Sequence, residues 1–185
     1  VLLSIVQAAL SDHRHNVDLQ KQIQEGIRSL SFMREATFCI RTLEETRLLA
    51  GLLANACPEP SRVVLGLSEL LINAVEHGNL GITYQEKSAL MAKRGWSDEV
   101  ERRLHLPEYC NRVVSVQFQR LPDNIKITII DQGNGFDWEK YLVMDPSRAF
   151  DSHGRGIAMS KLLSFDHLEY IGNGNTVELT IHISQ

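Results

Sequence analysis

The sequence lacks the features that would direct a chain to a membrane or to nucleic acid. No apolar run approaches the roughly 20 residues needed to span a bilayer. No block of basic residues occurs, and the net charge over 185 residues is −4. Nothing therefore indicates binding to an anionic membrane or to duplex DNA. The two commonest nucleotide loops, Gly-x-x-x-x-Gly-Lys-Ser/Thr and Gly-x-Gly-x-x-Gly, are absent as well.

Cysteines are few, and their number and placement bear on the compartment. Cys39, Cys57 and Cys110 are scattered and lack the spacing of a metal site. An odd, sparse set is typical of free thiols in a reducing compartment. Because the sequence begins in a helical pattern without a signal peptide, we expect a piece of a longer cytoplasmic protein. A composition of 43% hydrophobic and 23% charged residues is that of a globular domain.

The first segment, residues 1–32, has a helical pattern that ends near residue 30. Leu19, Ile23, Ile27 and Leu30 recur at spacings of three and four residues. Such a narrow apolar stripe is typical of a coiled-coil seam or of a helix packed on a neighbouring domain. A linker helix and a dimerisation segment, which would make the protein a homodimer, both remain open.

Residues 33–185 alternate irregularly between strands and helices. Thr42 and Glu45 have the spacing of a capping box, and Ser61 is the expected cap of the next helix, which should end at Gly78. Residues 80–110 are polar and are expected to form an insertion over the domain edge. The pattern predicts an α+β fold, a two-layer α/β sandwich with a mixed, largely antiparallel sheet and helices on one face. The expected strands are 36–42, 112–119, 124–130, 167–171 and 176–183, and the expected helices are 44–56, 61–77, 84–93, 97–104 and 156–163.

A polar stripe stands out on the helix expected over 61–77. Glu69, Asn73 and His77 are each one turn apart, about 6 Å along the axis, so they share one face. A stripe of this kind is often only a solvated face, but this one contains no Lys or Arg. The Asn73 amide oxygen suits Mg²⁺, which proteins usually bind together with substrate phosphates and water. Glu69 is a candidate base.

A second candidate group follows the apolar strand that ends at Ile130. Asp131 lies where its carboxylate could accept a hydrogen bond from an exocyclic amine, which would select adenine over guanine. The alternative is an ordinary aspartate in a turn. Gly133 and Gly135 allow backbone angles that other residues avoid.

The third group precedes and follows the last helix. Gly154, Arg155 and Gly156 stand before it, where backbone N–H groups and the helix N-terminus can bind an anion. Arg155 would add charge there, or be solvated. Thr176, at the start of the last strand, could reach a purine through its hydroxyl or be a plain strand residue.

These ordered motifs resemble the N, G1 and G2 boxes of the GHKL ATPase superfamily, which includes gyrase, ninety-kilodalton heat-shock chaperones, histidine kinases and MutL-type proteins. The resemblance is closer to the anti-sigma-factor serine kinases. It rests on Glu-x-x-x-Asn-Ala-x-x-His-Gly at 69–78, on Gly-Arg-Gly-Ile at 154–157 and on Gly-Asn-x-Val at 174–177. It covers residues 33–185.

The resemblance implies the Bergerat ATP-binding fold with ATP or ADP and Mg²⁺ as cofactors. By position, Asn73 would coordinate Mg²⁺, Glu69 would be the base toward a protein serine, and Asp131 would bind the adenine amine. Residues 137–153 would form a lid over the phosphates, and His77 would serve packing or phosphate contact. The remaining members of the implied nucleotide site are Gly133, Gly135, Phe136, Gly154, Arg155, Gly156 and Thr176.

The implied function is an ATP–Mg²⁺-dependent protein serine kinase that binds a protein partner, either an anti-anti-sigma-like substrate or a sigma factor. One alternative is a nucleotide-responsive binding module without turnover in a two-component response regulator. Residues 1–32 resemble the final helix of a receiver domain, which would then lie in the same chain. A pocket that no longer binds ATP is the third possibility. A histidine kinase is disfavoured, because neither His13 nor His15 is followed by the acidic residue that usually comes just after a phosphoacceptor histidine.

Overall fold

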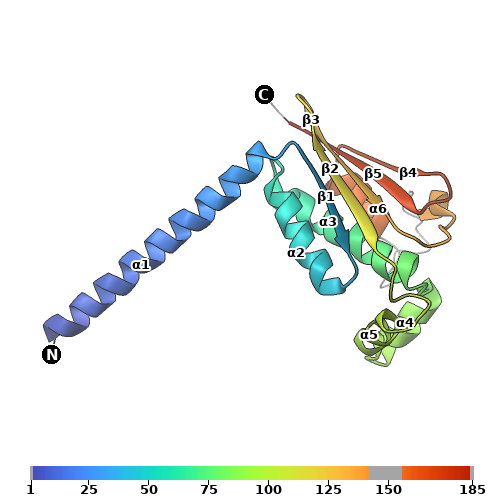
Figure 1. Cartoon of the computed structure of the whole chain (residues 1–185), viewed down its shortest axis with the longest axis horizontal. Coiled ribbons are helices and arrows are strands. Elements are labelled where there is room, and N and C mark those ends of the chain that lie inside the picture. Colours follow the sequence, from blue (N-terminus) through green and yellow to red (C-terminus); the bar gives the residue numbers. More distant parts are fainter. Residues whose placement is uncertain (1, 142–155, 184–185) are drawn as a thin grey trace. The chain divides into compact units, whose positions relative to one another are not determined.

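The first of the chain's two units is mainly one helix. A computed structural model describes residues 2–141 and 156–183 (Figure 1). It divides the chain at residues 33 and 34 into two units. The first holds α1 (Leu2–Ser29) and the short η1 (Leu30–Phe32). Leu10, Val17 and Ile23 are exposed on α1. Among the residues that the structure describes, no helix is long and apolar enough to cross a membrane.

The second unit is built on a five-stranded sheet in the order β1-β2-β3-β5-β4. Every pairing between neighbouring strands is antiparallel. Alternate side chains are buried along each central strand, as in Val114, Val116 and Phe118, so one face of the sheet carries the core. The strands are β1 (Glu35–Ile40), β2 (Val114–Arg120), β3 (Asn124–Ile130), β4 (His167–Ile171) and β5 (Thr176–His182).

Three helices form the second layer, α2 (Leu43–Asn55), α3 (Pro60–Asn73) and α6 (Gly156–Leu163). Figure 1 shows them on one side of the sheet, and α3 packs against both α2 and α6. The α+β two-layer sandwich predicted from the sequence is therefore confirmed, with an antiparallel sheet in its described pairings. A single 3-10 turn, η3 (Trp138–Tyr141), follows β3.

Two expected helix caps have opposite outcomes. The Thr42–Glu45 capping box is confirmed, with the Glu45 N–H donating to Thr42 Oγ1 at 3.2 Å and the Thr42 N–H donating to Glu45 Oε2 at 2.9 Å. The cap at Ser61 is wrong, because α3 begins at Pro60 with Glu59 as its N-cap. Proline suits the first helical position, since its φ is already helical and its missing N–H is not needed there.

The end of α3 also differs from the expectation. The α-helix stops at Asn73 and continues as a π-helix, η2 (Ala74–Asn79), in which the Leu80 N–H donates to Val75 O at 2.9 Å. A π-helical turn shifts the side chains that follow it relative to α-helical spacing, and such turns often occur at functional sites. The single α-helix expected through His77 is thus wrong in its last turn.

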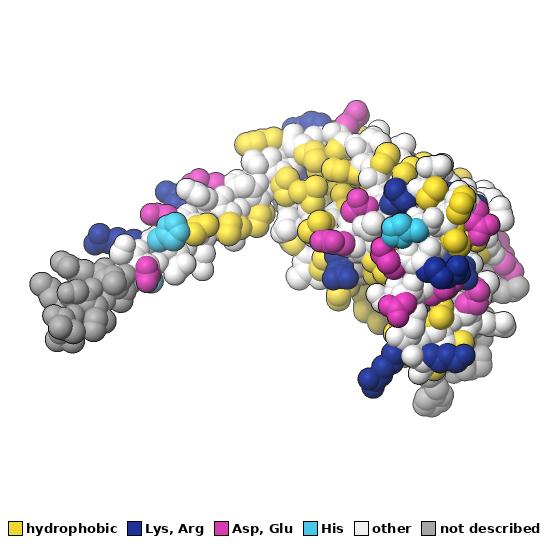
Figure 2. Space-filling view, turned by 60° about the horizontal axis from the view of Figure 1, so that its bottom comes forward, with side chains coloured by type: hydrophobic (Ala, Val, Ile, Leu, Met, Phe, Trp, Pro, Cys, Tyr) yellow, Lys and Arg dark blue, Asp and Glu magenta, His cyan; other side chains and the backbone are white. Residues whose placement is uncertain are grey.

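Residues 80–110 form the expected insertion. It contains α4 (Tyr84–Ala92) and α5 (Trp96–Leu104), which lie together beyond the end of α3 in Figure 1. Thr83 and Glu86 make a second capping box at the start of α4. Figure 2 shows one face of the second unit, on which acidic and basic side chains are intermingled.

Candidate functional site

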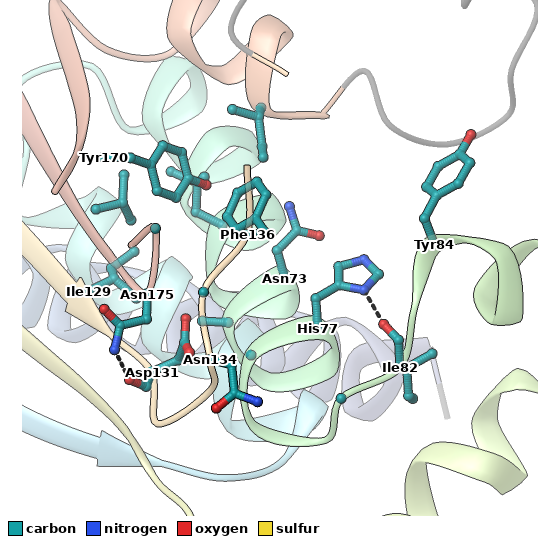
Figure 3. Close-up of a pocket in the computed structure, with 18 of the residues that line it drawn as sticks. Asn73, His77, Ile82, Tyr84, Ile129, Asp131, Asn134, Phe136, Tyr170 and Asn175 are labelled. Atoms are coloured by element: carbon teal, nitrogen blue, oxygen red, sulfur yellow. Dashed lines mark hydrogen bonds between the residues drawn. The ribbon is translucent and has the colours of Figure 1, made fainter. Parts of the chain in front are cut away.

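A cavity of about 830 Å³ lies where α3, η2, the insertion and the ends of β3, β4 and β5 meet (Figure 3). Its walls come from segments far apart in the sequence. Helix α3 and η2 contribute Glu69, Asn73 and His77; the sheet side contributes Ile129, Asp131, Tyr170, Asn175 and Val177; the insertion contributes Thr83, Tyr84, Lys87 and Tyr109.

The polar stripe of α3 lines one wall of this cavity. Glu69, Asn73 and His77 are half-buried. The Asn73 Nδ2 amide lies 3.4 Å from Glu69 Oε1 and donates to it. Because this amide nitrogen faces Glu69, the Asn73 Oδ1 atom is on the side of His77 in Figure 3.

His77 is held by the backbone of the insertion. Its Nδ1 atom is hydrogen bonded to the carbonyl oxygen of Ile82 (Figure 3). A carbonyl oxygen only accepts, so Nδ1 carries the proton. In the neutral ring Nε2 is then the acceptor.

At the opposite end of the cavity, backbone hydrogen bonds fix Asp131 just beyond β3. The Asp131 N–H donates to Asn175 O at 3.0 Å, and Asn175 Nδ2 donates back to Asp131 O at 3.3 Å. The Gly133 N–H donates to Asp131 Oδ1 at 2.8 Å. Burial raises the pKa of Asp131 to about 6, although the Gly133 N–H and the charge of Arg112 lower it in part. The carboxylate is a partly desolvated acceptor that faces the cavity.

Two glycines allow the close approach of η2 to Asp131. A Cβ atom on Gly78 would lie 2.3 Å from Asp131 Cγ, and one on Gly133 would lie 2.4 Å from Gly78 O. Both distances are shorter than any non-bonded carbon contact, so neither position accepts a side chain without movement of the backbone. The packing of η2 against Asp131 therefore depends on both glycines.

Aromatic side chains close this end of the cavity. The rings of Phe136 and Tyr170 meet edge to face with centroids 5.2 Å apart, and Trp138 stacks on Tyr170 at 6.0 Å. Burial raises the pKa of Tyr170 well above its usual range. Together with Ile129 and Val177, the aromatic pair offers an apolar slot that suits a flat ring.

The insertion is attached to the cavity wall through a buried carboxylate. Glu76 of η2 is fully buried. Its Oε2 accepts from Lys87 Nζ of α4 at 2.5 Å, and its Oε1 accepts from the indole Nε1–H of Trp96 at the start of α5. Lys87 lines the cavity.

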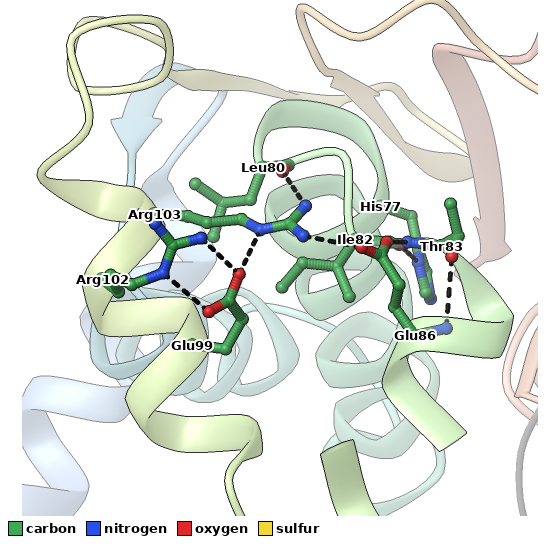
Figure 4. A network of polar contacts seen from close by, with 8 residues as sticks. All are labelled: His77, Leu80, Ile82, Thr83, Glu86, Glu99, Arg102 and Arg103. Atoms are coloured by element: carbon green, nitrogen blue, oxygen red, sulfur yellow. Dashed lines mark hydrogen bonds and ion pairs between the residues drawn. The ribbon is translucent and has the colours of Figure 1, made fainter. Parts of the chain in front are cut away.

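A second polar network holds the insertion from outside (Figure 4). Arg103 donates to Glu99 Oε1 at 2.7 Å, to Glu86 Oε1 at 2.9 Å and to Leu80 O at 2.9 Å. Arg102 and Arg103, which both donate to Glu99, lower the pKa of that carboxyl to about 2. Both helices of the insertion are thereby tied to the segment that follows η2.

The structure brings most of the predicted site residues to this one cavity. The residues in its wall are Glu69, Asn73, His77, Asp131, Gly135 and Phe136. Gly133 instead supports Asp131 from behind. The side chain of Thr176 is directed to its neighbour, with Oγ1 3.5 Å from Asn175 Oδ1, and Asn175 is the one that lines the cavity.

Three further predicted residues precede α6 or begin it. Gly154 and Arg155 lie outside the described residues, as do residues 142–153 of the expected lid. Gly156 is the first residue of α6.

Sequence reasoning missed several wall residues. Asn175 was signalled by its place beside Gly174, and Tyr170 by the alternation of β4. Tyr84, Lys87 and Tyr109 come from the insertion, where no motif marked them.

A metal ion at this site would depend on the ligand. Among the described residues, no three His, Cys, Asp or Glu side chains cluster in a way that could hold an ion. An amide oxygen such as that of Asn73 fits Mg²⁺ when phosphates and water supply the other ligands.

Comparison with known protein families identifies the domain. Residues 33–181 match the histidine kinase-like ATPase domain. The chain belongs to this family. The match confirms the resemblance to the GHKL superfamily and implies that this histidine kinase-like ATPase domain binds ATP, for which the cavity is the candidate site. A comparison with curated proteins finds no match.

Proposed function

We propose that this histidine kinase-like ATPase domain is an ATP–Mg²⁺-dependent protein serine kinase of the anti-sigma-factor type, which also binds its protein substrate in cytoplasmic signal transduction. The observation that carries the proposal is the pairing of Glu69 with Asn73 in the cavity wall. A carboxylate beside a metal-binding amide places a proton acceptor next to the phosphates, which a module that only binds nucleotide would not need.

The two ends of the cavity would divide the work on ATP. The adenine ring would lie between Ile129, Phe136 and Tyr170, with its exocyclic amine donating to the Asp131 carboxylate. The Asn73 oxygen would hold Mg²⁺ together with the phosphate oxygens. The bound metal would neutralise part of the phosphate charge, and that is its chemical contribution.

In the transfer itself, a serine hydroxyl oxygen of the partner attacks the γ-phosphorus. The bond from that phosphorus to the β,γ-bridging oxygen breaks, and ADP leaves. Glu69 accepts the hydroxyl proton. Phosphoryl transfer of this kind depends mainly on positioning and on charge stabilisation, with little covalent chemistry for the protein.

The test separates binding from transfer. We expect calorimetric titration to give ATP binding that is stronger with Mg²⁺ and that weakens at least tenfold in Asn73→Ala. Glu69→Gln, which keeps the shape of the side chain, should bind Mg-ATP within about twofold of the parent and should lose transfer to the serine partner. Glu44→Gln, an exposed change in the first turn of α2, is the matched control. Transfer at the parental rate by Glu69→Gln would show that the base is assigned wrongly.

A second candidate is the nucleotide-responsive binding module without turnover. The observation that favours it is that Tyr84 and Lys87 of the insertion line the same cavity. A bound nucleotide would therefore contact the insertion, whose outer surface would be the one that binds a partner. Binding of Mg-ATP without ATP hydrolysis or transfer to any serine-bearing partner would favour this candidate over the kinase.

A further inference from the structure

The attachment of the insertion places a cation in the cavity wall. Glu76 is fully buried, and both of its oxygens have partners on the insertion, Lys87 and Trp96. A buried carboxylate is tolerated only when it is paired and hydrogen bonded. The pairing fixes the position of the Lys87 ammonium as firmly as that of the carboxylate.

The orientation of this ion pair is informative. Lys87 lines the cavity, whereas Glu76 is not part of its wall, so the carboxylate lies behind the ammonium. The Lys87 side chain retains 15% of its exposure, against 0% for Glu76. An ammonium group has three N–H donors, and Glu76 takes one of them. The pair therefore presents its positive end, with donors to spare, toward the cavity.

The cations in the described cavity wall lie at different ends. Arg112 donates to Asn79 O at 2.9 Å, and its charge lowers the pKa of Asp131, so it belongs to the Asp131 end. Lys87 is one helical turn from Tyr84, the first residue of α4, and only the N-cap Thr83 separates α4 from Ile82, whose carbonyl holds His77. Lys87 therefore belongs to the end of the cavity that holds Asn73 and His77.

We propose that Lys87 is a phosphate-binding residue: its ammonium donates to the terminal phosphates of the nucleotide, so that the α4–α5 insertion forms part of the nucleotide site. This proposal rests on the nucleotide binding described under the proposed function. Lys87 then discriminates nucleotides by the number of their phosphates. Its pairing with buried Glu76 holds the ammonium in place before the ligand arrives, which limits the entropy that binding costs.

The experiment compares ATP, ADP and AMP by calorimetric titration, at constant Mg²⁺, in four proteins. They are the parent, Lys87→Met, the double variant Glu76→Gln/Lys87→Met, and Lys93→Met as a control on the exposed C-cap of α4. We expect Lys87→Met to weaken ATP binding at least tenfold and AMP binding less than twofold. Lys93→Met should leave all three affinities unchanged.

The double variant distinguishes phosphate binding from a purely structural role. Lys87→Met alone leaves a buried carboxylate without its cation, which can disturb the fold. The double variant removes both charges, so the fold should recover, while the loss of ATP affinity should persist. Recovery of parental ATP binding in the double variant would overturn the proposal, as would equal weakening of ATP and AMP.

The outcome for the parent separates the two levels of the argument. If the parent binds no ATP, the proposed function fails and this inference fails with it. If the parent binds ATP and Lys87→Met keeps the parental ratio of ATP to AMP affinity, only the role of Lys87 is refuted.

Discussion

The two ends of the cavity are built on different physical principles. At the Asp131 end, position is fixed by backbone hydrogen bonds to Asn175 and by the close approach of Gly78 and Gly133. At the insertion end, position is fixed by the buried Glu76 carboxylate, which accepts from the Lys87 ammonium and from the Trp96 indole. The packed backbone of the Asp131 end leaves no room for a side chain, whereas the insertion end changes when a single side chain is replaced. Under the proposed function, the Asp131 end would bind the adenine that all adenine nucleotides share, and the insertion end would bind the phosphates, whose number varies.

The largest expected effect is that of Gly78→Ala, which disrupts the packing at the Asp131 end. In Gly78→Ala the new methyl group would lie 2.3 Å from Asp131 Cγ, so η2 or the turn after β3 must move. Overpacking of this kind typically costs about 1–3 kcal/mol, and we expect a loss of about 3 kcal/mol in the free energy of unfolding, measured in urea. ATP and AMP should lose affinity together, because both depend on the adenine end.

The matched control for Gly78→Ala is the same substitution in open space. A Cβ atom on Gly51, inside α2, would have no neighbour within 4 Å. Gly51→Ala should stabilise the domain by about 0.4–1 kcal/mol through the lower entropy of the unfolded chain and better helix propensity. Equal stability of the two variants would mean that the Gly78 contact is relieved at no cost, and that backbone fit does not define this end.

The contrast also explains what the sequence could predict. Asp131, Gly133 and Gly135 are neighbours in the sequence, and a strand followed by a glycine turn predicts their grouping without knowledge of the fold. That these residues lie in one site with Asn73 was predicted only from the resemblance to the GHKL superfamily. The sheet was predictable because the alternation along its central strands is regular.

The insertion end was not predictable from such patterns. Lys87 and Trp96 lie 11 and 20 residues from Glu76, at spacings that no local motif requires. The π-helix of η2 shifts Glu76 out of the α-helical phase assumed for that helix. The predicted cap at Ser61 was wrong for a different, local reason, because Pro60 occupies the first position of α3. Contacts that depend on tertiary packing have no periodic signal in one sequence.

A smaller effect tests the electrostatics of the Asp131 end. The pKa of Asp131 in the fold is about 6, above its unperturbed 3.8, because burial disfavours the charged form. The folded state thus binds more protons than the unfolded state between these values, so the contribution of Asp131 to stability falls as the pH rises from about 4 to 6 and is constant above about 7. Asp131→Asn removes this dependence while its side-chain oxygen still accepts from Gly133.

We expect the stability of Asp131→Asn relative to the parent to increase by about 1–2 kcal/mol between pH 4 and pH 7. Urea unfolding of both proteins across that range measures the difference, and other titrating groups cancel because they are common to both. Asp123→Asn, in the exposed turn before β3, is the matched control substitution. A difference that decreases with pH would mean that the charge of Arg112 and the Gly133 N–H outweigh burial in setting the pKa of Asp131.

The smallest of the predicted effects concerns the outer polar network of the insertion. Glu99 accepts from Arg102 and Arg103 at 2.7 to 2.8 Å (Figure 4), and the Arg102 side chain is 57% exposed. Ion pairs near the surface contribute about 0–1 kcal/mol, so Glu99→Gln should lower the free energy of unfolding by less than about 1 kcal/mol. Its effect should be local, as faster amide hydrogen exchange in α5, because Arg103 still donates to Leu80 O and Glu86.

The affinity of Glu99→Gln for nucleotides shows how far the phosphate-sensitive part of the site extends. If the insertion end is defined by the buried Glu76 cluster alone, Glu99→Gln should bind ATP, ADP and AMP as the parent does. A selective loss of ATP affinity in Glu99→Gln would extend the phosphate-sensitive part of the site from Lys87 to the outer network around Arg103. The phosphate-sensitive part of the protein would then extend beyond the cavity wall into the packing of the insertion, and the outer surface of α5 would respond to the nucleotide.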